Sequence, residues 1–134
     1  MTRKIEDQAK AFLLTKFSNP PWRFQDKSGD ERGFDLWLTG SPGDQRRKIE
    51  LKATTRAFGR PSHLLERLVF NSDEERQLFE SGETWIARVF LGSTPPKVVI
   101  ITNAILGDSA KLRADERYTI RGRANYDGSY FALN

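Results

Sequence analysis

Three charged side chains interrupt apolar runs in the stretch 33–55, where "FDLWL" and "RKIELKATT" are predicted β-strands. Asp35 lies inside the first run, and Glu50 and Lys52 flank a leucine in the second. Acids and lysines are poor strand formers, and a half-buried charge costs free energy unless something pairs with it. Carboxylate oxygens can hold Mg²⁺ together with substrate phosphates, and a nearby lysine can orient a water molecule or neutralise phosphate charge. These residue types therefore favour metal-assisted chemistry at a phosphate.

The two predicted strands are separated by Gly-Ser-Pro-Gly-Asp at 40–44, which predicts a turn. A turn at 41–44 places the apolar residues of both strands on one face of a hairpin. On the other face Asp35 lies opposite Glu50, beside Lys52. Facing carboxylates repel, and a divalent cation between them would convert the repulsion into a binding site. The alternative is a solvent-exposed strand face on which Lys52 and nearby arginines balance the two acids.

Helices and strands are predicted on both sides of this hairpin. Apolar residues recur at helical spacing over residues 3–17, "SNPP" ends that helix, and "WRFQ" is a short predicted strand. A second helix starts at a capping box, in which Ser72 and Glu75 each bond to the other's main-chain N–H, and it ends at Gly82. Two apolar strands, "TWIARVFL" and "KVVIIT", follow, and Asp127 with Gly128 predicts a final hairpin. This order predicts one α/β domain spanning residues 1–134.

The spacing of the acids matches a known signature. Asp35, then fourteen residues, then "ELK" resembles the PD-(D/E)XK motif of the restriction-endonuclease-like nuclease superfamily. More narrowly, the chain resembles a family related to Mrr-like nucleases, whose members include the C-terminal domain of the plant protein NO VEIN. In that family a "GYDI…IEVK" stretch precedes a helix that starts "(S/T)xxE". The similarity extends over residues 5–103, and Phe34 stands at the proline position of the motif.

The resemblance implies a restriction-endonuclease-like core, a central mixed β-sheet flanked by helices. It implies that Asp35 and Glu50 ligate Mg²⁺ or Mn²⁺, that the Leu51 carbonyl is a further ligand, and that Lys52 is the catalytic lysine. An acid on the first helix often joins such sites, and Glu6 is the candidate here, since a helical wheel also places it inside the apolar stripe. The implied function is a metal-dependent endonuclease that hydrolyses phosphodiester bonds in nucleic acid, with DNA as the expected substrate. The alternative is a catalytically silent nucleic-acid-binding or scaffolding module with the same fold.

The charge balance fits a nucleic-acid partner without requiring one. The chain has 22 Lys and Arg against 18 Asp and Glu, a net charge of +4, and a pI near 9.6. Phosphate contacts are expected from five basic residues, Arg46, Arg47, Lys48, Arg56 and Arg60.

Trp37 and His63 are two further residues for which a role in nucleic-acid binding is conceivable from the sequence. Trp37 could stack on a base, but packing under the first helix is the stronger expectation, and the lone His63 is expected to be inert. Cysteine is absent, the start of the chain is charged where a signal peptide is apolar, and no apolar run spans a membrane. We therefore expect a cytoplasmic protein. Because a domain of this size has little surface for a long target, a homodimer or a protein partner remains open.

Overall fold

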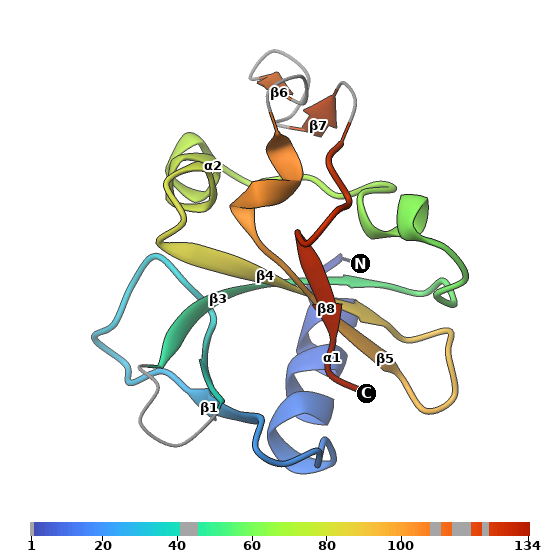
Figure 1. Ribbon diagram of the computed structural model, residues 1–134. Helices are drawn as coiled ribbons and strands as arrows, with labels where there is room; N and C mark the ends of the chain where they lie inside the picture. Colours follow the sequence, from blue (N-terminus) through green and yellow to red (C-terminus); the bar gives the residue numbers. More distant parts are fainter. Residues whose placement is uncertain (1, 41–45, 108–110, 114–118, 122–123) are drawn as a thin grey trace.

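The computed structural model describes residues 2–40, 46–107, 111–113, 119–121 and 124–134. Its main element is a six-stranded sheet with the order β1-β2-β3-β4-β5-β8 (Figure 1). These strands are β1 Arg23–Asp26, β2 Leu36–Thr39, β3 Arg47–Thr54, β4 Thr84–Phe90, β5 Lys97–Ile101 and β8 Tyr130–Ala132. β3 and β4 are parallel, and every other neighbouring pair is antiparallel. The predicted α/β class with a mixed sheet is therefore confirmed.

Helices cover both faces of this sheet (Figure 1). One face packs against α1 (Thr2–Thr15), and the other packs against α2 (Asp73–Glu80) with the 3₁₀ turns η1 (Pro61–Leu64) and η2 (Asn103–Leu106). Neighbouring residues of a strand point to opposite faces, so β4 and β5 each contribute apolar residues to both cores. In β3, Ile49 and Leu51 belong to the α1 core. None of the helices in the described ranges is both long enough and apolar enough to cross a bilayer.

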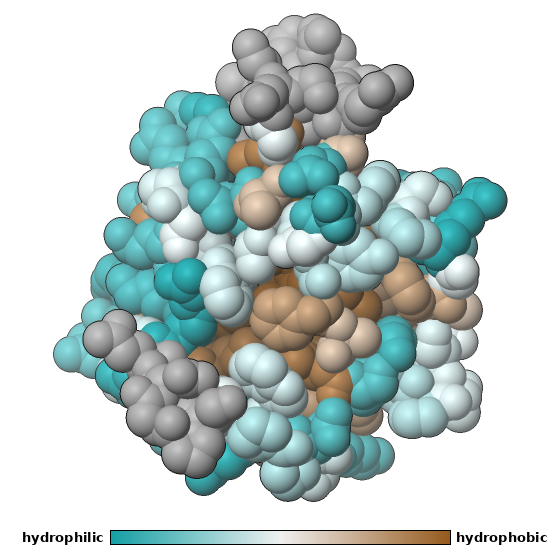
Figure 2. Space-filling model, viewed as in Figure 1, coloured by the Kyte–Doolittle hydropathy of each residue, from teal (hydrophilic) through white to brown (hydrophobic). Residues whose placement is uncertain are grey.

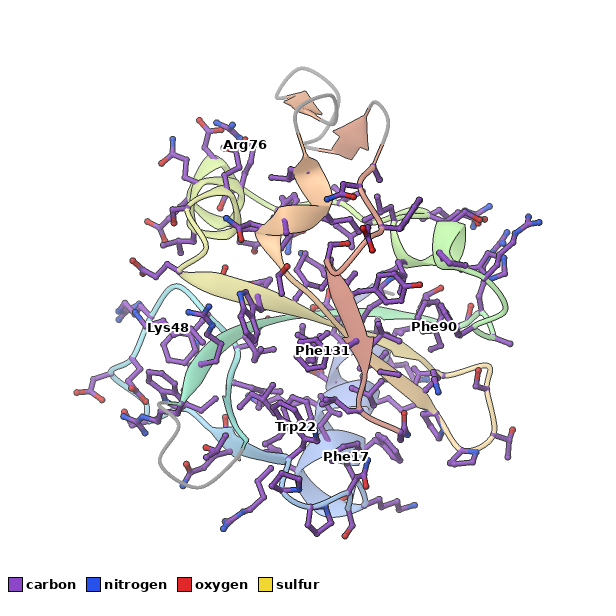
Figure 3. The ribbon with its side chains drawn as sticks, viewed as in Figure 1. Phe17, Trp22, Lys48, Arg76, Phe90 and Phe131 are labelled. Carbon is purple, nitrogen blue, oxygen red and sulfur yellow. The ribbon has the colours of Figure 1, made fainter. Side chains whose placement is uncertain are left out.

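The α1 core continues into an apolar surface patch. Figure 2 shows this patch near the middle of the face in view, and Figure 3 places Trp22 and Phe131 there. Their rings lie 5.5 Å apart, and Phe131 also meets Trp85 edge-on at 6.0 Å. Trp22 and Trp85 are therefore partly buried against the core, as expected for packing residues.

The α2 helix begins and ends as the sequence predicts, with one difference. Ser72 Oγ accepts from the N–H of Glu75 at 3.2 Å, and Gly82, at φ +83°, donates to the Phe79 carbonyl. The Glu75 carboxylate does not return to Ser72, as the capping box predicted, but accepts from the N–H of Asn71 at 3.0 Å. The acid at the start of α2 therefore faces the sheet rather than closing the cap.

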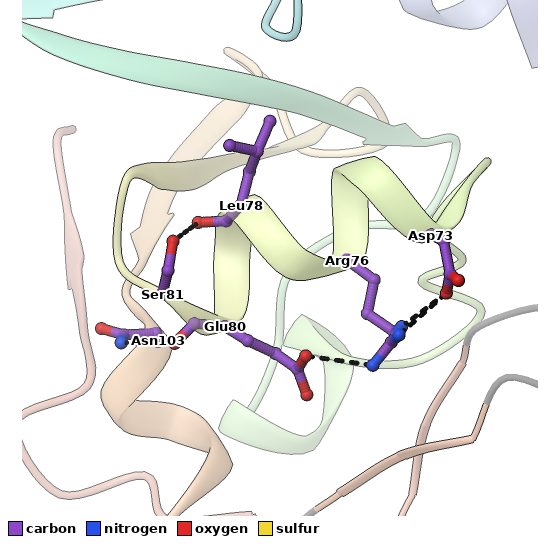
Figure 4. Close-up of polar contacts among 6 residues, drawn as sticks. All are labelled: Asp73, Arg76, Leu78, Glu80, Ser81 and Asn103. Carbon is purple, nitrogen blue, oxygen red and sulfur yellow. Dashed lines mark hydrogen bonds and ion pairs between the residues drawn. The ribbon is translucent and has the colours of Figure 1, made fainter.

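The solvent-facing side of α2 is tied down by polar contacts (Figure 4). The Arg76 guanidinium lies 2.8 Å from Asp73 and 3.0 Å from Glu80. Asn103 Nδ2 of η2 donates to the Glu80 carbonyl, which joins the end of the helix to the neighbouring 3₁₀ turn. These contacts fix the helix that carries Glu75.

The predicted final hairpin is wrong. Gly128 has the positive φ of a turn, +69°, but β8 pairs with β5, with Ala132 opposite Val99. A separate two-stranded ribbon is formed by β6 (Lys111–Arg113) and β7 (Thr119–Arg121). The apolar β5 would otherwise present an open edge, and β8 covers it. The turn expected at 41–44 lies outside the described residues.

Candidate active site

The β2–β3 hairpin has the register predicted from its apolar pattern. Leu36 is opposite Ile49, and the ladder continues toward the turn from there. Asp35 lies just before β2, and its N–H donates to the Ile49 carbonyl at 2.8 Å. Its Oδ2 accepts from the Leu51 N–H at 2.7 Å. One hydrogen bond through its main chain and one through its carboxylate therefore hold Asp35 against β3, next to Glu50.

Glu50 and Lys52 point to the α2 face, where both are buried, with 6 % and 5 % of their surface exposed. Lys52 Nζ lies 3.7 Å from Glu50 Oε2 and 2.9 Å from Glu75 Oε1. The same ammonium group lies 5.8 Å from the centre of the Phe70 ring. The lysine is therefore oriented by two carboxylates at the border of the apolar core.

The charge of this cluster is unbalanced toward the acids. Burial raises the pKa of Glu50 to about 9, and the neighbouring charges of Asp35 and Glu75 add to the effect, while Lys52 opposes it. In the free protein Glu50 therefore keeps its proton at neutral pH. A cation would replace that proton, because it neutralises the negative charge that burial disfavours.

Glu6 reaches the same region from α1. Its pKa is raised, first by burial, while Lys52 lowers it and the charges of Asp35 and Glu75 raise it further. Glu6 and Lys52 also line one cavity of about 250 Å³. The structure thus brings the predicted helix acid to the lysine and the two hairpin acids.

Glu75 is the acid that sequence reasoning missed. Ser72 three residues before it was interpreted only as a capping signal, which explains a helix start but not the direction of the acid. In the structure Glu75 Oε1 accepts from both Asn71 N–H and Lys52 Nζ. Its position in the first turn of the helix that connects two parallel strands is the sequence feature that could have indicated a site residue.

Arg88 and Arg67 were also missed, and both line the cavity next to Lys52. Arg88 is 2 % exposed and donates to the Glu66 carbonyl at 2.5 Å. Burial lowers its pKa to about 10. Arg88 stands in the apolar run "TWIARVFL", so the reasoning that singled out Asp35 would also have found it.

The predicted basic contacts lie in two places away from this cavity. At the start of β3, Arg46 covers the Trp37 ring and Arg47 the Trp85 ring, each at 3.9 Å, and Lys48 pairs with Glu83 at 3.4 Å. Arg47 also lines an aromatic cavity of about 440 Å³. Lys52 is five residues further along the strand, about 16 Å away at about 3.3 Å per residue. Figure 3 shows Lys48 at one end of the β3–β4 pair and Phe90, which ends β4, at the other end.

The second basic group follows β3. Arg56 pairs with Glu66 at 2.5 Å, and Arg60 is exposed. His63 Nδ1 accepts from the Gly59 N–H at 3.0 Å, which gives the histidine a structural role in this loop. The structure therefore brings the predicted acids and lysine together but leaves the predicted phosphate contacts at a distance from them.

The expectation that Trp37 packs under the first helix is wrong. Its indole Nε1 donates to Glu31 at 3.2 Å, and its ring meets Phe34 edge-on at 4.7 Å. Its position opposite Lys48 places it on the sheet face away from α1. Trp37 thus forms part of a polar and aromatic surface at the hairpin.

The acids offer oxygen ligands without a complete cage. Within the described ranges, no group of three or more His, Cys, Asp and Glu side chains has the arrangement of a metal site. Mg²⁺ is commonly held by one or two carboxylates plus waters and substrate phosphates, so Asp35 and Glu50 have the donor chemistry that this ion requires. Comparison with known proteins finds no matching family model, no matching curated protein and no matching solved structure. The function must be argued from the site itself.

Proposed function

We propose that this protein is a metal-dependent endonuclease with a restriction-endonuclease-like core, and that it hydrolyses phosphodiester bonds in nucleic acid, with DNA as the expected substrate. The observation that carries the proposal is the convergence of Asp35, Glu50 and Lys52 on one sheet face. Lys52 is nearly inaccessible to solvent, yet two acids hold its amine. A strand without a chemical task would gain stability from apolar residues at these positions.

Asp35 and Glu50 would hold Mg²⁺ or Mn²⁺, with Glu6 as a further acid. The Leu51 carbonyl is a suitable additional ligand, because its N–H donates to Asp35 and both main-chain groups of an extended residue face the same edge. β2 ends its ladder at Leu36, so that edge is not covered by a further β2 residue. A bound ion supplies Lewis-acid polarisation of the phosphate and a water of lowered pKa.

Lys52 would supply the part of the chemistry that comes from a protein side chain rather than from the metal ion. Its ammonium donates to an oxygen of the phosphate or orients the attacking water. The ion pair with Glu75 holds the amine in position for that contact. Glu75 is therefore a positioning residue. The basic residues at both ends of β3 would hold the backbone of the substrate without reading its sequence, namely Arg46, Arg47, Lys48, Arg56 and Arg60.

A catalytically silent binding or scaffolding module is the second candidate. It is favoured by the ion pair of Lys52 with Glu75, which already engages the amine. In this case the buried charges would organise the fold around a partner.

Cleavage assays separate the two candidates. Purified protein is tested with Mg²⁺, Mn²⁺ and Ca²⁺ on duplex, branched and single-stranded substrates. We expect nicking with Mg²⁺ or Mn²⁺, and a rate reduced about 10²–10⁴-fold in Lys52→Met, which keeps the length of the side chain. Lys10→Ala is the matched control, since it removes a lysine that is ion-paired with Asp26. Tight nucleic-acid binding without cleavage of any substrate would establish the module instead.

A further inference from the structure

The cavity next to Lys52 is also lined by two arginines, Arg67 and Arg88, that the proposed hydrolysis does not use. It has a volume of about 250 Å³ and lies between α1, β3, β4 and the segment that joins η1 to α2. Three cationic residues line it, Lys52, Arg67 and Arg88, against the single acid Glu6. At about 30 Å³ for each water of the liquid, the space holds a tetrahedral anion with a few waters. The cavity is therefore suited to an anion in both size and charge.

Lys52 and Arg88 are register partners in the parallel pair of β3 and β4, so their side chains leave the same sheet face side by side. Like charges in directly opposite positions are destabilising. Lys52 is balanced by Glu50 and Glu75. Arg88 has no carboxylate within ion-pair distance among the described residues, and the nearby Glu66 acid pairs with Arg56 instead. Within the described residues the buried charge of Arg88 is thus left without a direct ion pair, and Glu66 acts on it only from a longer distance.

The hydrogen bonds of Arg88 are incomplete as well. One terminal nitrogen donates to the Glu66 carbonyl. The buried Nε has no hydrogen-bond partner in the parts of the chain that the structure describes. A buried donor without a partner costs free energy, and the planar fork of an arginine matches the oxygens of phosphate. An anion in the cavity would satisfy both the charge and the donor.

Arg67 adds backbone strain at the same cavity. It has φ of +58°, and it is the non-glycine residue with positive φ among the described residues. An arginine in this conformation is strained, whereas glycine adopts it freely. Strained residues gather at ligand sites, where the side chain is needed in a fixed place. Asn71 contributes a further polar group to the lining.

We propose that this cavity is a subsite for a phosphomonoester, held by Arg67 and Arg88 beside Lys52. Arg88 is nearly inaccessible at 2 % exposure, so its ligand must enter the cavity. A group attached to the substrate through one bond can enter, whereas a backbone phosphate has chain on both sides. The doubly charged monoester also matches a lining with more cations than acids. Resting on the proposed nuclease function, the subsite would hold the phosphorylated end of a nucleic-acid strand.

The first experiment measures thermal stabilisation by inorganic phosphate, with EDTA present and ionic strength matched with chloride. We expect phosphate to raise the melting temperature of the wild type and of Arg32→Ala, which removes an exposed arginine that is not part of this lining. The effect should be lost in Arg67→Gly. This variant relieves the strained φ, so its own melting temperature should equal or exceed that of the wild type. Arg88→Lys, which keeps the charge and loses the fork, should bind phosphate more weakly.

The second experiment compares oligonucleotides that differ only in a terminal phosphate. We expect the phosphorylated strand to bind about 10- to 100-fold more tightly, as for one or two hydrogen bonds to a charged group, and Arg67→Gly to erase the preference. Equal affinity for both strands, or phosphate stabilisation that persists in Arg67→Gly, would overturn the subsite. Neither readout needs metal or cleavage. A protein that shows the preference but cuts nothing would refute the nuclease alone, and one that cuts without the preference would refute the subsite alone.

Discussion

The two faces of β3 are buried to nearly the same extent and contain opposite chemistry. Toward α1 the strand presents Ile49 and Leu51, and toward α2 it presents Glu50 and Lys52. On the first face burial stabilises the fold through the apolar area removed from water. On the second face burial raises the free energy of the charged groups, and it raises the pKa of Glu50. One strand therefore stabilises the fold with alternate residues and, with the others, buries ionisable groups at a cost in stability.

The largest effect is expected from the apolar face. Ile49→Ala should lower the free energy of unfolding by about 2–5 kcal/mol, because it removes buried methyl groups and leaves a cavity. Urea denaturation measures the change. Lys48→Ala, the neighbouring residue with an exposed ion pair to Glu83, should change stability by less than about 0.5 kcal/mol. A similar loss in both variants would show that the two faces do not differ as described.

Glu50→Gln, on the charged face, should raise the free energy of unfolding, whereas Ile49→Ala lowers it. Because the pKa of Glu50 is about 9 in the folded protein and 4.5 in the unfolded chain, the folded state binds more protons in that interval. Wild-type stability should therefore fall as pH rises through it, by up to about 1.4 kcal/mol per pH unit, and the loss should be absent in Glu50→Gln. Unfolding curves at several pH values between 5 and 9 test this. Glu83→Gln, an exposed acid, should keep the wild-type slope.

Metal binding gives a second, independent test of whether Glu50 is protonated in the free protein. Mg²⁺ or Mn²⁺ should displace about one proton from Glu50 at neutral pH, which titration calorimetry in buffers of different ionisation enthalpy detects. Asp35→Asn should weaken that binding because it removes a ligand charge. Binding without proton release would place the ion elsewhere.

A smaller effect is expected at the start of α2. Ser72→Ala removes the side-chain cap on the Glu75 N–H and should cost about 1 kcal/mol of stability. It should also lower the cleavage rate with little change in substrate affinity, since Glu75 orients Lys52. Ser81→Ala, at the other end of the helix, loses a bond to the Leu78 carbonyl and should leave the rate unchanged. Equal rates in wild type and Ser72→Ala would remove Glu75 from its positioning role.

The smallest effect concerns the exposed cations. If Arg56 and Arg60 contact phosphates, replacing both with alanine should reduce the salt dependence of nucleic-acid affinity by about 0.9 log units per log unit of salt for each lost contact. Filter binding or anisotropy at several salt concentrations measures the slope. Arg23→Ala, an exposed arginine of β1, is the control. An unchanged slope in the double variant would assign backbone contacts to the cations at the start of β3.

The hairpin register was predictable because strand side chains alternate, and a slip of one residue would turn Leu36 and Ile49 to opposite faces. That register also predicted the approach of Asp35 to Glu50. The contact of Lys52 with Glu75 was not predictable, since a capping box fixes where a helix begins and not where it docks. The side-by-side placement of Lys52 and Arg88 was not predictable either. It depends on the parallel pairing of β3 with β4, and the whole α2 crossover separates these strands in the sequence. The prediction of a final hairpin was wrong because it rested on a local turn signal, whereas β8 pairs with the open edge of the distant strand β5.

The parallel pairing of β3 with β4 has a consequence for the order of folding. The β2–β3 hairpin closes a short loop, so Asp35 and Glu50 meet early, when the chain is still open to water and both acids stay hydrated. Lys52 and Arg88 come together only after the crossover with α2 has closed, which is a slower, non-local step. Desolvation of the charges therefore falls late, after the apolar contacts of the hairpin exist. We therefore expect the candidate site to form after the hairpin, and a brief local opening of the crossover would expose it to water without unfolding the hairpin.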